Sequence, residues 1–296
     1  MPCGYANARI ACSAFIKTLL LQLFVTANRT VLVDTVQPVE TQARPYGGPN
    51  AGLFINSFDR FNGDPFNHDC RTNNSSGLCH GLAVWTLVNP GTSSDKLSFA
   101  FVDSANYVLP PNADQPGSPA SVATLDTRIS GTPIYHNGLI SFALETNINN
   151  GTQNVAGILW GQVAPQLNDD GTLASASLYQ QGYYYYSGTG SAYFGALMPD
   201  ADGDLFMVFE FSNNSFDPGV AYVTRRVAFP PGKFHDNGLF LKTGEAATTN
   251  TRWGDYEATS YNGPSNDKVW FAGEYSASNG DWSTYIGSSS LCVGCN

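Results

Sequence analysis

The stretch DGDLFMVFE (202–210) decides the fold, because near copies of it recur as NGLISFALE (137–145) and NDKVWFAGE (266–274). Each copy opens on a turn dipeptide and continues through a run of mostly apolar residues. The three copies end in Glu145, Glu210 and Glu274. Asn-Gly and Asp-Gly supply the positive φ angles that tight β-hairpins require, so each copy predicts a turn leading into a buried strand.

A weaker fourth copy, AGLFINSFD (51–59), carries Gly52 in the turn and Asp59 in the acidic position. The three clear copies recur at a spacing of about 65 residues. Recurrence at a fixed long period indicates an array of similar supersecondary units. With several short strands in each unit, it predicts an all-β, β-propeller-like array of four recognisable blades, while a solenoid is the alternative architecture. The array is either a small closed propeller or the C-terminal part of a larger one.

The domain organisation follows from this repeat. Residues 1–27 form a candidate signal or leader segment, and residues 28–296 form a single propeller-like domain. The predicted repeats cover about 45–125, 126–180, 181–245 and 246–290.

Charge and composition narrow the classes of partner. The net charge is −10, and the 14 basic residues are scattered along the chain. Nucleic-acid binding needs a concentrated basic surface, so this class is excluded, and an anionic membrane surface is disfavoured for the same reason. The apolar run 10–25 is interrupted by Lys17 and is too short for a transmembrane segment, although it suits a signal peptide. We therefore expect a secreted protein or one at the cell surface.

Cysteines and sequons are consistent with that location. Cys70 and Cys79 enclose a small polar loop, and Cys292 and Cys295 lie at the end of the chain. We favour disulfides for these four cysteines, with a metal site at His68, Cys70, Cys79 and His80 as the alternative for the first pair. Sequons permit N-glycosylation at Asn28, Asn73, Asn74, Asn150 and Asn213.

Two long stretches resemble a known family. They are SLYQQGYYYYSGTGSAYFGALMPDADGDLFMVFEFS (177–212) and TRWGDYEATSYNGPSNDKVWFAGEYSASNGDWSTYIG (251–287). They are similar to the last two blades of secreted sialidase-like β-propeller proteins, and the resemblance covers about 45–296. Two departures are that the family is usually longer at the N-terminus and that its strict Asp-box is absent here. The segment SNGDW (278–282) is only a loose echo of that box.

The resemblance implies a candidate catalytic set. Arg44, Arg128 and Arg252 each precede the first strand of a repeat. If they converge in a central channel, three guanidinium groups could bind a carboxylated sugar, as a sialidase requires. Asp255 and Tyr256 would then supply an acid and a nucleophile, with Glu257 beside them. Adjacent strand residues point to opposite faces, however, so Asp255, Tyr256 and Glu257 cannot all face one pocket. For the three arginines we favour ion pairs with carboxylates that bridge neighbouring blades.

The remaining candidates concern binding. Asp200, Asp202 and Asp204 alternate around Gly203, a pattern that suggests a calcium-binding loop. We favour a hairpin turn over calcium binding for this segment. In the run Tyr183–Tyr186, alternation on a strand should expose two rings and bury two, and we assign Tyr184, Tyr186 and Trp253 as rings that stack on a sugar. The recurrence of the three glutamates favours a repeated structural role, such as accepting backbone N–H bonds, over catalysis.

The sequence therefore favours binding of a glycan or another extracellular partner over catalysis. A sialidase-like glycoside hydrolase is the alternative enzyme, and a self-assembling structural subunit of an extracellular assembly is the third hypothesis. The sequence pattern requires no cofactor, and it leaves calcium binding open as an alternative.

Overall fold

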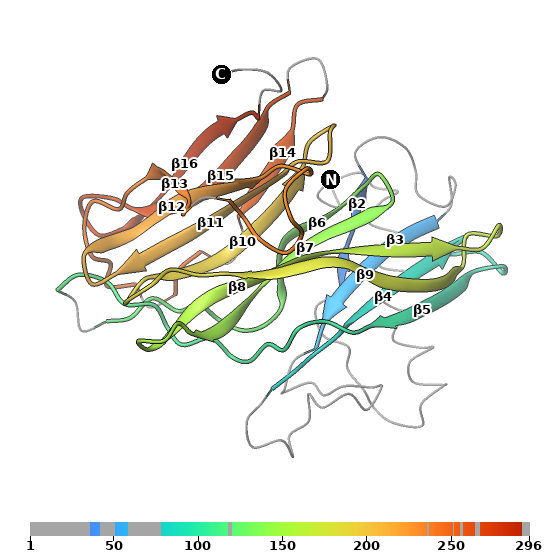
Figure 1. Ribbon diagram of the computed structural model, residues 1–296, viewed down its shortest axis with the longest axis horizontal. Coiled ribbons are helices and arrows are strands. Elements are labelled where there is room, and N and C mark those ends of the chain that lie inside the picture. Colours follow the sequence, from blue (N-terminus) through green and yellow to red (C-terminus); the bar gives the residue numbers. More distant parts are fainter. Residues whose placement is uncertain are drawn as a thin grey trace.

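The computed structural model describes residues 36–41, 51–58, 78–117, 120–235, 237–250, 252–254, 257–263 and 267–291. These residues form sixteen β-strands in four sheets of three to five strands, without a helix (Figure 1). The predicted all-β class is thus confirmed for the described part of the chain. That part accordingly contains no helix able to cross a membrane.

Sheets I and II come from residues 37–184. Sheet I has the order β1 (Gln37–Pro38), β3 (Ala51–Ser57), β4 (Leu82–Val88) and β5 (Lys96–Val102). Sheet II has the order β2 (Glu40–Thr41), β6 (Ile129–His136), β7 (Leu139–Asn149), β8 (Asn154–Leu167) and β9 (Leu173–Tyr184). Neighbouring strands pair antiparallel except β2 and β6, which pair parallel.

Sheets III and IV come from the second half and are entirely antiparallel. Sheet III has the order β10 (Ser191–Pro199), β11 (Leu205–Asn213), β12 (Phe216–Arg225) and β13 (Leu239–Lys242). Sheet IV has the order β14 (Ala258–Tyr261), β15 (Val269–Ser276) and β16 (Trp282–Ser289).

The turns before β7, β11 and β15 are those that the repeated phrase predicts. Asn137 and Gly138 adopt φ angles of 47° and 86° before β7. Gly203 adopts 86° before β11, and Asp267 adopts 41° before β15. These angles lie in the left-handed region that the turn residues were expected to supply. The prediction of a turn followed by a strand is confirmed in the first two copies; in the third, β15 follows Asp267, while Asn266 lies outside the described residues. In the weaker fourth copy, Gly52 lies within β3 and not in the turn that was predicted for it.

The sheets pack face to face along the chain (Figure 1). β9 lies against β5, β10 lies against β6, β7 and β8, and β15 lies against β11 and β12. Every residue of β10, and all but the last of β11, is buried. A sheet covered on both faces needs such continuous apolar runs rather than simple alternation. The stack explains why LFMVF (205–209) contains five consecutive apolar residues.

Sheet IV is covered on one face only within the described structure. Along β15, Val269 and Phe271 are buried against sheet III, whereas Trp270 between them is exposed. Trp282 and Ile286 of β16 are exposed as well. The outer face of sheet IV therefore presents large apolar side chains to solvent.

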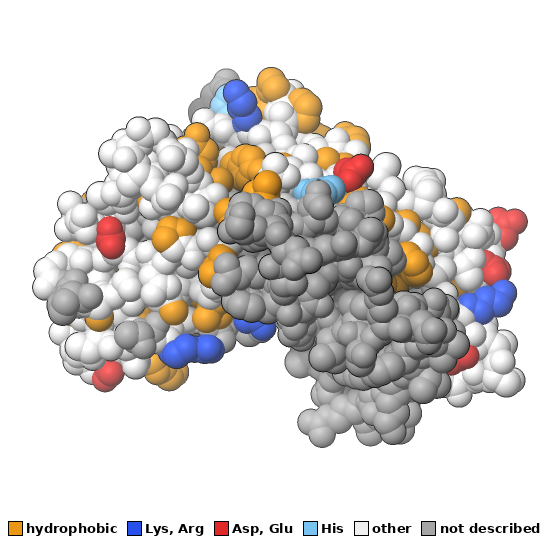
Figure 2. All heavy atoms as spheres, turned by 90° about the horizontal axis from the view of Figure 1, so that it is seen from below, with side chains coloured by type: hydrophobic (Ala, Val, Ile, Leu, Met, Phe, Trp, Pro, Cys, Tyr) orange, Lys and Arg blue, Asp and Glu red, His pale blue; other side chains and the backbone are white. Residues whose placement is uncertain are grey.

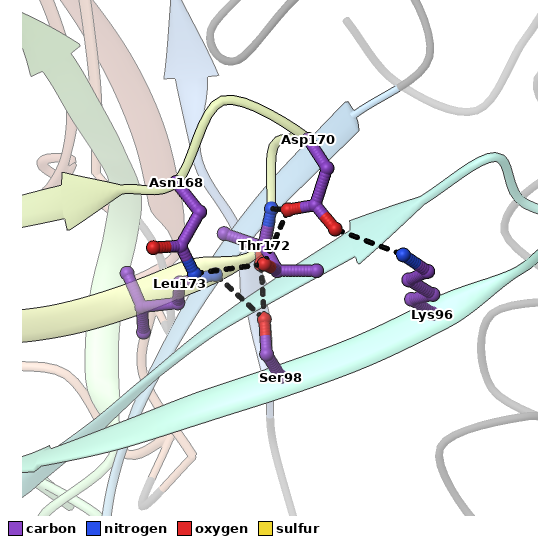
Figure 3. Close-up of polar contacts among 7 residues, drawn as sticks. Lys96, Ser98, Asn168, Asp170, Thr172 and Leu173 are labelled. Carbon is purple, nitrogen blue, oxygen red and sulfur yellow. Dashed lines mark hydrogen bonds and ion pairs between the residues drawn. The ribbon is translucent and has the colours of Figure 1, made fainter.

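A polar junction joins sheet I to the turn between β8 and β9 (Figure 3). Lys96 of β5 donates to Asp170 at 2.8 Å, and Ser98 accepts the backbone N–H of Leu173 at 2.7 Å. Asp170 also accepts hydrogen bonds from the backbone and hydroxyl of Thr172. Hydrogen bonds from Lys96 and Thr172 hold the pKa of Asp170 well below its usual range. This junction explains the polar Asn-Asp-Asp-Gly-Thr sequence (168–172) as a turn that contacts the neighbouring sheet.

Candidate functional site

A pocket opens between sheets II and III, beside the turns of two copies of the repeated phrase. Its volume is about 350 Å³, near the lower end of the ~300–1,000 Å³ that ligand pockets span. Its lining comprises His136, Asn137, Leu139, Gln162, Tyr179, Gln180, Pro199, Asp202, Gly203, Arg225, Val227, Phe229 and Pro231. Because the β6–β7 and β10–β11 turns lie at the same end of the two sheets, the packed repeats create this pocket.

The floor of the pocket includes a chain of side-chain amides. Gln180 of β9 donates to the Oε1 of Gln162 on β8 at 2.6 Å, and Gln162 donates to the hydroxyl of Ser141 on β7 at 3.1 Å. The Oε1 of Gln180 also accepts the backbone N–H of Gly232 at 3.3 Å. The Gly232 bond joins the loop that follows β12 to sheet II, while the other two bonds join β9, β8 and β7 within that sheet.

Arg225 forms part of the opposite wall, at the end of β12. Its side chain is almost completely buried, and its Nη2 donates to the carbonyl of Phe229 at 2.6 Å. The buried Nε has no hydrogen-bond partner in the described structure. Burial lowers the pKa of the Arg225 guanidinium, while Tyr179 and Asp204 act in the opposite direction. Asp204 itself accepts the backbone N–H of Val227 at 2.7 Å, which shapes the same loop.

Two further side chains add an apolar surface and a polar group to the lining of the pocket. The ring of Tyr179 is 61% exposed and offers an apolar face beside the polar wall. His136 contributes an Nε2 atom that is buried and without a partner among the described residues. An aromatic face with convergent polar groups is the usual lining of a small-molecule or sugar site.

Sequence reasoning did not identify His136, Tyr179 or Arg225. The available signal was the recurrence of the turn dipeptides, because Asn137-Gly138 and Asp202-Gly203 had to lie at one end of packed sheets. No pattern in the sequence shows that Arg225 is buried, since basic residues near strand ends are usually solvated.

A second, much smaller cavity lies beside Glu145. Its volume is about 20 Å³, and its lining includes Asp126, Arg128, Ser130 and Glu145. This is room for a single water rather than for a sugar ring. Arg128 forms an ion pair with Asp126 at 2.7 Å, and both side chains are partly buried. This ion pair joins residues two positions apart and so does not by itself bridge neighbouring sheets; the bridging role that we favour for Arg128 stays a prediction.

Glu145 links sheet II to sheet III. Its Oε1 accepts hydrogen bonds from Ser130 Oγ at 2.9 Å and from the backbone N–H of Gly195 at 3.2 Å. Gly195 lies within the irregular register between Tyr193 and Ala196 of β10, so its N–H is outside the regular ladder. Burial raises the pKa of Glu145 from 4.5 to about 8, although the hydrogen bonds oppose the rise. The structural role predicted for this glutamate is confirmed.

Glu210, in the next copy of the phrase, has a different environment. It is completely buried and interacts electrostatically with Glu257, which is also buried. The four carboxyl oxygens and the indole nitrogen of Trp253 have no hydrogen-bond partner within the described residues. Burial, then the charge of Glu257, raises the pKa of Glu210 well above its usual range, and burial raises that of Glu257 to about 7. The expected backbone N–H partner is therefore wrong for Glu210, whose neighbour is a second acid.

The other predicted catalytic residues are not assembled by the described structure. Arg252 is exposed. Arg44, Asp255 and Tyr256 lie outside the described residues. The convergence of three arginines on one channel therefore stays a prediction.

The predicted alternation of exposed and buried rings in Tyr183–Tyr186 is confirmed, but the assignment of Tyr184, Tyr186 and Trp253 as rings that stack on a sugar is wrong. Tyr183 and Tyr185 are exposed, whereas Tyr184 is buried and packs against Phe209. Tyr186 is partly buried against the same cluster, and Trp253 is buried beside Tyr193 and Phe194. Since these faces are covered by core residues, Tyr184, Tyr186 and Trp253 are not available to stack on a sugar. The exposed ring at the pocket is Tyr179.

The aspartate run forms a turn. Asp200 Oδ1 accepts the backbone N–H groups of Asp202 and Asp204 at 3.0 and 2.9 Å. Because two backbone donors share this single oxygen, as in an Asx-type turn, the geometry favours the turn over calcium. Burial, then the charge of Asp204, raises the pKa of Asp200 to about 6. In the described ranges, no group of three or more His, Cys, Asp or Glu residues could hold a metal ion.

Cysteines and sequons lie only partly within the described ranges. Cys79 is buried and disulfide-bonded, but Cys70, Cys292 and Cys295 lie outside, so the pairing stays a prediction. Asn150 donates to the carbonyls of Tyr186 and Gly188, which disfavours its glycosylation. Asn213 accepts two backbone N–H groups through Oδ1, and these bonds do not occupy its nitrogen. Asn28, Asn73 and Asn74 lie outside the described ranges.

No family model matches the chain, and no curated protein sequence matches it. On the face shown in Figure 2, the coloured Lys and Arg side chains lie apart from one another rather than in a patch. The choice of function therefore depends on the pocket geometry.

Proposed function

We propose that this protein is a secreted or cell-surface protein that binds a glycan in the pocket between sheets II and III. The observation that carries the proposal is the exposed Tyr179 ring beside a wall of glutamine, asparagine and histidine side chains. A sugar presents an apolar ring face together with several hydroxyl groups, so it suits this combination. The resemblance to secreted sialidase-like propellers supports the same extracellular setting.

We interpret the four packed sheets as blades of a propeller-like array. Face-to-face packing of successive, mainly antiparallel sheets supports this interpretation. Glycoside hydrolysis receives less support, because Glu145, Glu210 and Glu257 are all buried and a catalytic acid must reach its substrate.

The test is binding of a panel of neutral and acidic oligosaccharides, measured by isothermal titration calorimetry. Tyr179→Ala should weaken binding about tenfold or more, as truncation of a central aromatic contact does. Tyr185→Ala is the matched control, because Tyr185 is exposed but does not line the pocket. Binding that resists Tyr179→Ala, or no binding across the panel, would refute the proposal.

Self-assembly is a second candidate, favoured by the exposed Trp270, Trp282 and Ile286 on the outer face of sheet IV. Apolar side chains gathered on a sheet face commonly mark an interaction surface. A monomer at all concentrations in size-exclusion chromatography would oppose this candidate.

A further inference from the structure

We propose that the pocket selects a glycan carrying a carboxylate, such as a uronic acid, and that Arg225 and His136 bind that carboxylate. This inference rests on the proposed glycan-binding function and assigns the chemical class of its ligand. It involves arginine and histidine side chains that the sequence had not singled out.

The first argument is that Arg225 is buried without an ion pair in the described ranges. Its side chain is only 3% exposed, yet no carboxylate forms an ion pair with it in the described ranges. Its single hydrogen bond is to the Phe229 carbonyl, and its Nε remains without a partner there. A buried charge without a counter-ion is strongly unfavourable, so the site lacks an anionic group.

Asp204, the acid that acts electrostatically on Arg225, does not form that ion pair in the described ranges. Asp204 is close enough to influence Arg225 electrostatically, but its Oδ1 accepts the Val227 N–H. Asp202 lies at the pocket as part of the turn rather than in an ion pair with Arg225. Arg225 therefore lines the pocket without an ion pair to an acidic side chain of the described ranges.

His136 supplies a second donor from the other sheet. It is the last residue of β6, whereas Arg225 is the last residue of β12, and both line the pocket. A neutral imidazole can carry its proton on Nε2, the atom that has no partner in the described structure. Two donors from opposite walls suit a group with two acceptor oxygens.

The surrounding charge favours one carboxylate over a heavily sulfated or phosphorylated ligand. The chain has a net charge of −10, and Asp202 lines the pocket itself. The acidic protein would repel a ligand with many anionic groups. A ligand with one carboxylate on an otherwise neutral sugar can place its hydroxyl groups against the side-chain amides of the pocket and its ring face against Tyr179.

The experiment compares glucuronate, glucuronate methyl ester and glucose, together with a digalacturonate and its methyl ester. Calorimetric affinities should favour the free acids by roughly 10- to 100-fold, as expected for a hydrogen bond to a charged group. Sodium acetate and sodium sulfate are tested as competitors, and only acetate should compete.

Arg225→Gln should remove the preference for the free acid. Arg226→Gln is the control, because it deletes the adjacent positive charge outside the pocket lining. Since Arg225 is buried, its variant could misfold, and circular dichroism would reveal this. His136→Ala gives a second test on a half-buried side chain and should reduce the same preference.

Three outcomes would overturn the inference: equal affinity for acids and esters, an unchanged preference in both pocket variants, or stronger competition by sulfate. If neutral sugars still bind through Tyr179, the glycan-binding function stands while its acidic specificity fails. If no sugar of any kind binds, both proposals fail.

Discussion

Replacing Glu145 by glutamine should make the protein more stable at pH 8 while leaving it nearly unchanged at pH 5. In the folded protein, the Glu145 carboxyl is buried and accepts hydrogen bonds from Ser130 and Gly195. The carbonyl oxygen of a glutamine can accept both bonds, and its amide group would face a cavity of about 20 Å³ with room for one water. The substitution therefore preserves the two hydrogen bonds and removes the ionisable carboxyl group.

The magnitude follows from the pKa. Burial raises the pKa of Glu145 from 4.5 to about 8. Below pH 4.5, the carboxyl is protonated in both the folded and the unfolded chain. Between pH 4.5 and 8 the unfolded chain releases this proton while the folded protein retains it, so stability falls as the pH rises. A tenfold change in proton affinity corresponds to about 1.4 kcal/mol, so the complete loss is about 4–5 kcal/mol.

A loss of that size is a large part of the roughly 5–15 kcal/mol that stabilises a typical domain. We expect Glu145→Gln to match the wild type within about 1 kcal/mol at pH 5 and to exceed it by several kcal/mol at pH 8. Urea unfolding followed by tryptophan fluorescence at intervals between pH 5 and pH 8 measures the difference. Comparing two proteins at each pH cancels the titration of all other groups.

The control is Glu245→Gln. Glu245 is an exposed acid paired with Lys242, and the hydrogen bond from Lys242 lowers its pKa. This control should show no gain in stability at high pH. Parallel pH profiles for wild type and Glu145→Gln would refute the reasoning, because Glu145 would then be ionised in the folded state at pH 5.

Two further predictions concern the junctions between sheets. Glu210→Gln should likewise reduce the loss of stability from pH 5 to pH 8, because burial and the charge of Glu257 raise the pKa of Glu210. If calcium instead stabilises the wild type at pH 8 and not the variant, the two acids bind a cation and Glu210 does not retain its proton. Gly131→Ala should destabilise by more than about 2 kcal/mol in urea unfolding, because Gly131 has a φ of 64° and an added Cβ would lie 2.7 Å from the Cβ of Ala196. Gly138→Ala provides the comparison, since Gly138 has a φ of 86° with no atom within 4 Å of an added Cβ, so a similar loss in both variants would rule out the close approach as the cause.

The hairpins could be predicted from sequence because their determinants are local. Asn137-Gly138 adopts positive φ angles, and Leu139–Asn149 continues as a strand, as the phrase requires. Period-two alternation also predicted two exposed and two buried tyrosines in 183–186. The assignment of Tyr184 and Tyr186 as exposed rings failed because alternation fixes the spacing of faces without telling which face meets the next sheet.

The pocket could not be predicted, because its residues meet only after sheets II and III pack. His136 and Arg225 are far apart in the sequence, and neither belongs to a recognisable motif. Arg225 is buried, and one nitrogen atom of each side chain lacks a hydrogen-bond partner within the described residues. Both properties exist only in the tertiary structure. A repeat indicates where sheets lie, but ligand contacts come from residues that the repeat does not share.

The glutamates show how one repeated position acquires different chemistry. The irregular register of β10 leaves the Gly195 N–H free to bond Glu145, so the first junction is satisfied. At the next junction the corresponding Glu210 meets Glu257, and its oxygens find no donor within the described residues. The strand recurs along the chain because its apolar run recurs, whereas the partner of its terminal acid depends on the sheet that follows. A repeated acid therefore identifies a junction between sheets, and only the neighbouring strand determines whether that acid accepts a hydrogen bond or holds a proton.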